Sequence, residues 1–144
     1  MRLSFLTIFL SASFSLFAQT SSQPDVSGTW VSENHDNVTW ILTQKDDALH
    51  VVEMTGEKPS ADFTCPLNGQ PCDVKIAGHS EKMMVYYNGD RLVEILEGHS
   101  GVTKRRLTVS ADGKILTVEV VPLSAQDKSE KTLFHRGGAA SSHS

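Results

Sequence analysis

The stretch VTWILT, residues 38–43, carries the pattern that decides the fold. Val38, Trp40 and Leu42 stand at every second position, and the stretch LTVEV, residues 116–120, repeats this two-residue period. Successive side chains of a β-strand point to opposite faces, so this period is typical of strands. No long window of the chain shows a convincing helical face. We therefore predict an all-β protein.

Turn sequences separate the predicted strands at short intervals. The pairs Asn88-Gly89 and Asp112-Gly113 favour hairpin turns, because Asn, Asp and Gly tolerate the positive φ that such turns need. The predicted strands are residues 26–33, 37–44, 48–55, 61–66, 72–77, 81–88, 91–98, 101–110, 114–122 and 129–136. Short turns predict an antiparallel up-and-down meander, and closure into a small β-barrel leaves no strand edge exposed. A two-sheet β-sandwich is the alternative, since turn spacing does not distinguish the two.

Residues 1–18 have the composition of a secretory signal peptide. Arg2 precedes an almost wholly apolar or hydroxylic run that ends at the small residue Ala18. Because serines interrupt this run and it is shorter than the roughly 20 residues that span a bilayer, we expect no transmembrane anchor in the mature chain. We expect an exported protein, periplasmic or extracellular, with one barrel domain over residues 19–136 and a disordered tail over residues 137–144.

The only two cysteines, Cys65 and Cys72, bound the stretch CPLNGQPC. An even pair in an exported chain favours a disulfide, and the proline and Asn-Gly residues between them allow a tight turn. A zinc site would need further Cys or His ligands at regular spacing, and none flank the pair. We predict a Cys65–Cys72 disulfide, with two free thiols as the alternative, and no metal site.

Charge and motif content argue against two function classes. The formal net charge is −4 and no basic stripe is present, which disfavours nucleic acid as a partner. The sequence lacks the Gly-x-Ser-x-Gly pattern of a nucleophile elbow, and its six histidines are scattered. Asp46-Asp47 falls in a predicted turn, where solvation explains the paired carboxylates. We expect no enzymatic activity and no cofactor.

The interior of a small barrel is either filled by side chains or holds one small ligand. We predict that any ligand is a small hydrophobic molecule, lined by large side chains and by an arginine of the run 104–106, because alternate residues of a strand face inward. The predicted lining residues are Trp40, Met54, Phe63, Met84, Tyr86, Arg105 and Arg106. An inward arginine would suit the carboxylate of a fatty acid; on the outside, the basic run would be solvated or pair with neighbouring acids, namely Glu94, Glu97 or Glu119.

The alternative function is that of an envelope or surface interaction module. In that case the barrel is filled, no ligand is bound, and an outer apolar patch around Ile41, Val85 and Tyr87 contacts a partner.

The stretch Gly28-Thr29-Trp30 resembles the Gly-x-Trp that opens the lipocalin and avidin class of barrels. In that class an Arg or Lys of the last strand lies across the Trp and closes one end, so the resemblance implies a pair between Trp30 and Arg136. Most of residues 25–136 is similar to small exported bacterial proteins of unknown function that are called lipocalin-like. The stretches that carry this resemblance are GTW, FTCPLNGQPC, YNG, KRR and ADGK. It implies a calycin-like β-barrel and brings no known activity.

Overall fold

The computed structural model describes residues 23–35, 37–123 and 127–137. The predicted signal peptide, residues 1–18, lies outside the described residues, and so do residues 138–144 of the predicted tail. Gly137, the first residue of that tail, donates its backbone N–H to the carbonyl of Thr29 at 2.7 Å and so continues the barrel wall. In the described part, no helix is long and apolar enough to cross a membrane.

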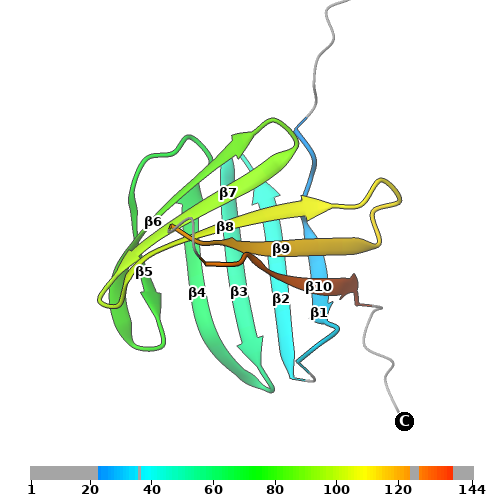
Figure 1. Cartoon of the computed structure of the whole chain (residues 1–144), viewed down its shortest axis with the longest axis horizontal. Helices are drawn as coiled ribbons and strands as arrows, with labels where there is room; N and C mark the ends of the chain where they lie inside the picture. The colour runs from blue at the N-terminus through cyan, green and yellow to red at the C-terminus, as the bar shows by residue number, and fades with distance from the viewer. Residues whose placement is uncertain (1–22, 36, 124–126, 138–144) are drawn as a thin grey trace, which may run out of the picture.

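Ten antiparallel strands form a closed barrel (Figure 1). The strands are β1 (Gly28–Ser32), β2 (Val38–Lys45), β3 (Ala48–Thr55), β4 (Lys58–Pro66), β5 (Cys72–Ile76), β6 (His79–Asn88), β7 (Arg91–Gly98), β8 (Gly101–Val109), β9 (Ile115–Val121) and β10 (Glu130–Arg136). Each strand pairs with the next, and β1 pairs with β10 to close the ring. Figure 1 shows β2, β3 and β4 side by side, with the long strands β6, β7 and β8 crossing them.

The predicted fold is confirmed and the β-sandwich is excluded. All ten predicted strands are present, and their ends differ from the prediction by at most three residues. Hairpin turns form where the sequence contains Asn, Asp or Gly. At the β2–β3 turn both Asp46 (φ 52°) and Asp47 (φ 57°) adopt the left-handed conformation that a two-residue turn of this kind requires.

The β4–β5 pair is the weakest junction of the described barrel wall. Its ladder contains one register pair, Ala61 opposite Ile76, whereas most neighbouring strands share several. Counting along both strands from that pair places Cys65 opposite Cys72, and these two form the predicted disulfide, which is confirmed. The disulfide therefore joins β4 and β5 where backbone hydrogen bonds between them are sparse.

The two ends of the barrel have different contents. We call the end that residues 23–27 cover the capped end, and the end with the turns after β1, β3, β5, β7 and β9 the far end. Val26 covers the capped end, and its carbonyl accepts a 3.0 Å hydrogen bond from the indole N–H of buried Trp30. Inward residues in this half are apolar and at most 2% exposed: Leu42, Leu49, Val85, Leu92, Leu107 and Leu116. The capped half is a filled hydrophobic core.

Candidate functional site

Three charged side chains meet inside the barrel on the far side of this core. Arg105 on β8 places its Nε atom 2.9 Å from Glu94 Oε2 on the neighbouring strand β7. Its Nη1 and Nη2 atoms each donate to Glu53 Oε1 on β3 at 3.3 Å. Strands β3 and β8 are five strands apart in either direction around the ring, so the contact crosses the interior. We call Glu53, Glu94 and Arg105 the interior charge cluster.

The members of the interior charge cluster differ in their access to solvent. The side chain of Glu94 is 1% exposed; its Oε2 atom contacts Arg105 Nε, and its Oε1 atom receives no hydrogen bond from the described residues. The side chains of Glu53 and Arg105 are 17% and 16% exposed, although both face inward. Solvent therefore reaches the cluster, while Glu94 is buried and its Oε1 atom lacks a donor among the described residues.

Burial and charge set the protonation of the cluster. Burial raises the pKa of Glu94; Arg105 opposes this shift, and the nearby carboxylate of Glu53 adds to it. Burial also acts to lower the pKa of Arg105, but the two carboxylates outweigh it and the net pKa shift is upward. Arg105 therefore stays charged, and burial favours the protonated form of Glu94.

Aromatic rings border the cluster. The guanidinium carbon of Arg105 lies 5.0 Å from the ring centroid of Trp40 on β2, within the range of a cation–π contact. The rings of Trp40 and Phe134 on β10 have centroids 4.9 Å apart at an interplanar angle of 39°. Phe63 on β4 also belongs to the buried core. The far half of the interior thus combines charge with aromatic surface.

The structure places three of the predicted lining residues inside the barrel, namely Trp40, Phe63 and Arg105. It does not bring Met54, Met84 and Tyr86 into the core, which corrects the prediction for these residues. The reason is strand parity, because each alternates with an inward neighbour. The inward neighbours are Glu53 on β3 and the fully buried Met83 and Val85 on β6.

Parity also changes the predicted roles of three other residues. Arg106 faces away from Arg105, and its Nη1 atom lies 3.9 Å from Glu119 Oε2 on β9. Val85 is fully buried, and Tyr87 packs against the core and hydrogen-bonds Gln44 at 2.7 Å. The predicted outer patch therefore loses both Val85 and Tyr87.

Sequence reasoning missed Glu53 and did not place Glu94 in the interior. Glu94 was expected only as an ion-pair partner of the basic run on a neighbouring strand. A signal for its position is present, because Glu94 stands between Leu92 and Leu96 at the two-residue period of an inward face. Glu53 follows Leu49 and Val51 at the same period.

The pair implied by the lipocalin resemblance lies at the capped end. The guanidinium carbon of Arg136 is 4.4 Å from the ring centroid of Trp30. Arg136 donates from Nε to the carbonyl of Gly113 at 2.8 Å and from Nη1 to the carbonyl of Ser27 at 3.1 Å. A Cβ atom on Gly28, whose φ is 149°, would collide with the Arg136 guanidinium, so the GTW glycine leaves room for this arginine.

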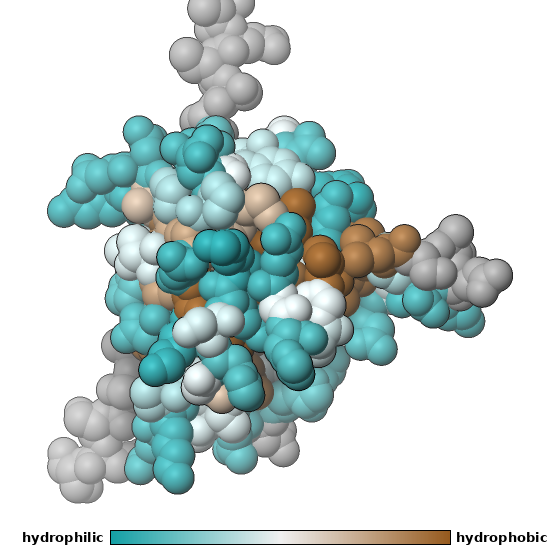
Figure 2. All heavy atoms as spheres, turned by 90° about the vertical axis from the view of Figure 1, so that its left-hand side faces the viewer, coloured by the Kyte–Doolittle hydropathy of each residue, from teal (hydrophilic) through white to brown (hydrophobic). Residues whose placement is uncertain are grey.

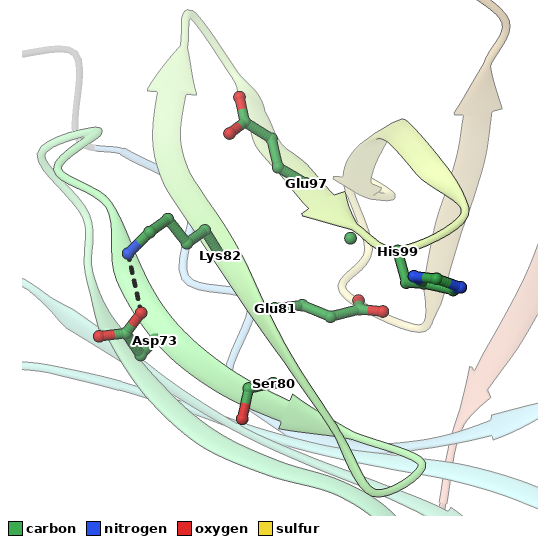
Figure 3. A pocket seen from close by; sticks show the side chains of 7 residues that line it. Asp73, Ser80, Glu81, Lys82, Glu97 and His99 are labelled. Carbon is green, nitrogen blue, oxygen red and sulfur yellow. Dashed lines mark hydrogen bonds and ion pairs between the residues drawn. The ribbon is translucent and has the colours of Figure 1, made fainter.

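The pockets on the outer surface of the described residues are open depressions. One, of about 390 Å³, lies near the β7–β8 turn and contains the ion pair between Lys82 Nζ and Asp73 Oδ1, at 2.9 Å. Figure 3 shows the carboxylates of Glu81 and Glu97 pointing apart at this place. The face shown in Figure 2 is mostly hydrophilic, with hydrophobic residues gathered near one edge. No group of three or more His, Cys, Asp or Glu residues in the described ranges is arranged to hold a metal ion.

These features define a closed ten-stranded antiparallel barrel with one filled half and one half that carries buried charge. The chain matches no family model and no curated protein. Among solved structures it is similar to the REP1-NXSQ fatty acid transporter, with a TM-score of 0.63 and 14% identity over 79% of this chain and 97% of that chain. It is also similar to human cRBP IV, with a TM-score of 0.60 and 17% identity over 79% of this chain and 99% of that chain.

A third similar structure is the fatty-acid-binding protein of Manduca sexta, with a TM-score of 0.55 and 20% identity over 68% of this chain and 72% of that chain. At these identities the likeness shows the fold. The chain has the fold of the calycin and lipocalin type of β-barrel.

Proposed function

We propose that this protein is a carrier or receptor that binds one small apolar molecule in the far half of its barrel. The fatty acid transporter and the fatty-acid-binding protein among the similar structures support this class of function. The observation that carries the proposal is the interior charge cluster. Buried ion pairs seldom stabilise a protein more than well-packed apolar residues would, so a cross-barrel cluster is poorly explained by stability alone.

The cluster also has the arrangement that a binding site needs. Ligand sites combine apolar and aromatic walls with a few polar groups that orient the ligand. Here Trp40 and Phe134 supply aromatic surface, and Glu53 and Arg105 supply polar atoms that solvent reaches. We propose that binding is the whole function, without catalysis. We also propose export, supported by the composition of residues 1–18 and by the disulfide.

A second candidate function is the surface interaction module, and the outer face of β1 and β2 supports it. Val31 and Ile41 are 39% and 40% exposed there, and contiguous exposed apolar patches mark contact surfaces. The two side chains alone make a small patch, so we place ligand binding first.

Mass spectrometry of the protein expressed from its full sequence tests these proposals. The native mass of material never exposed to denaturant is compared with the denatured, non-reduced mass of the same sample. A native excess equal to one small molecule supports ligand binding, and a denatured mass that lacks residues 1–18 supports export. Equal native and denatured masses, repeated after incubation with a mixed lipid extract, would favour the interaction module.

A further inference from the structure

Acidic side chains outnumber basic ones in the interior charge cluster. Two carboxylates, on Glu53 and Glu94, face one guanidinium, on Arg105. Arg105 already directs Nε toward one carboxylate and Nη1 and Nη2 toward the other. An anionic ligand would therefore compete with two resident carboxylates for this arginine and would meet their repulsion in a place of low dielectric.

Glu94 adds an independent observation. It is 1% exposed, its Oε2 atom contacts Arg105 Nε at 2.9 Å, and its Oε1 atom receives no hydrogen bond from the residues that the structure describes. A buried acceptor without a donor costs free energy, and native proteins almost always satisfy such groups. Glu94 lacks a hydrogen-bond donor at Oε1, and a carboxylate ligand carries no such donor.

The aromatic surface beside the cluster agrees with this charge preference. The faces of aromatic rings attract cations, and Trp40 already lies under the guanidinium of Arg105 at 5.0 Å. A cation moving along the interior would meet carboxylates and aromatic rings.

We propose that the polar head of the ligand is a protonated amine, so that the ligand is a cationic amphiphile with an apolar chain and not a fatty acid. This inference rests on the proposed function and names the chemical class of its ligand. The ammonium group donates to Glu94 and Glu53, and the apolar chain extends along the aromatic surface of Trp40.

Binding of three matched probes tests the proposal. Dodecylamine, dodecan-1-ol and dodecanoate share one chain and differ in the charge of the head group. Their binding to the disulfide-bonded protein is measured by calorimetry below their micellar concentrations, at one pH and one ionic strength. We expect dodecylamine to bind about ten to one hundred times more tightly than dodecanoate, the range that hydrogen bonds to charged groups supply.

Three variants separate the interior cluster from the general attraction of an acidic protein for amines. Glu94→Gln should lower the affinity for dodecylamine by about tenfold or more. The double variant Glu53→Gln/Glu94→Gln frees Arg105 and should reverse the preference toward dodecanoate. Glu97→Gln, an exposed residue of β7, makes the same change of charge on the outside and should leave the affinity unchanged. Circular dichroism and thermal unfolding verify that each variant is folded.

The outcomes distinguish this inference from the proposed function. If dodecanoate binds the wild-type protein as tightly as dodecylamine or more tightly, ligand binding stands and the amine inference is wrong. If Glu97→Gln lowers amine affinity as much as Glu94→Gln does, the attraction is a surface effect and the inference is wrong. If none of the three probes binds, the proposed function fails and the inference fails with it.

Discussion

Two tryptophan–arginine pairs lie in the same barrel with opposite surroundings. Trp30 and Trp40 are register partners on β1 and β2, and each has a guanidinium within 5.0 Å of its ring centroid. Arg136, over Trp30, donates to two backbone carbonyls and forms no ion pair with an acid of the described residues. Arg105, over Trp40, contacts two carboxylates, one of which is almost fully buried.

This difference indicates that the Trp30–Arg136 pair has a structural role. Arg136 forms its two hydrogen bonds with backbone carbonyls, and the indole N–H of Trp30 donates to the carbonyl of Val26. The cluster around Arg105 leaves Glu94 Oε1 without a donor among the described residues and sets two acidic side chains against one arginine. The Trp30–Arg136 pair, whose hydrogen bonds are made within the protein, closes the barrel. The cluster around Arg105, in which a buried carboxyl oxygen lacks a hydrogen-bond donor, has the character of a binding site.

Removal of Arg105 should produce the largest effect on stability. Arg105→Met leaves Glu53 and Glu94 inside the barrel without a counter-charge, and breaking a buried pair in this way costs about 3–5 kcal/mol. Urea unfolding at neutral pH measures the loss. The triple variant Arg105→Met/Glu53→Gln/Glu94→Gln should recover most of it, since it removes all three charges. A loss under 1 kcal/mol for Arg105→Met alone would show that the cluster is solvated.

The pH dependence of stability should come next in size. The folded pKa of Glu94 lies above its ordinary value of 4.5, because burial and Glu53 outweigh Arg105. Its contribution to stability is therefore fully present below pH 4.5 and is lost as the pH rises through the folded pKa, by about 1.4 kcal/mol per pH unit. Glu94→Gln should lack this loss, so urea unfolding from pH 4 upward should show its stability relative to wild type rising. Parallel curves for the two proteins would contradict the assignment.

Loss of the capped-end arginine should have a smaller effect. Arg136→Met removes a cation–π contact and two hydrogen bonds at the protein surface, which together contribute about 1–2 kcal/mol. The loss should be the same at pH 5 and pH 8, because no titrating carboxylate contacts Arg136 in the described part. Gly28→Ala, which pushes the guanidinium from Trp30, is a second route to the same loss, and the double variant should cost less than the two single losses combined.

The strands and the disulfide were predictable because they depend on local patterns. The two-residue period and the turn residues locate all ten strands, and their number makes closure the simplest way to leave no edge. The Trp30–Arg136 pair followed from resemblance to a known class. These features need no knowledge of which strands face each other across the barrel.

The interior charge cluster was predictable only in part, for two physical reasons. In the run MMVYY of β6 both faces are apolar, so the sequence does not say whether Met83 or Met84 faces inward. The contact of Arg105 with Glu53 joins strands five apart, and the tilt of strands in a closed barrel decides which residues meet at that distance. Arg105 was therefore found as an inward candidate, while its partner on β3 was not.

The smallest expected effect is spectroscopic, and it compares the two tryptophans directly. Trp30→Phe leaves Trp40 beside the interior charge cluster, and Trp40→Phe leaves Trp30 under Arg136. Indole emission responds to nearby charge, so the emission of Trp30→Phe should shift as the pH rises through the folded pKa of Glu94, which burial raises, and again on addition of dodecylamine. The emission of Trp40→Phe should stay constant in both titrations, because no carboxylate contacts Arg136 in the part of the chain that the structure describes. Equal responses from the two variants would show that the whole barrel, and not its far half alone, senses charge and ligand.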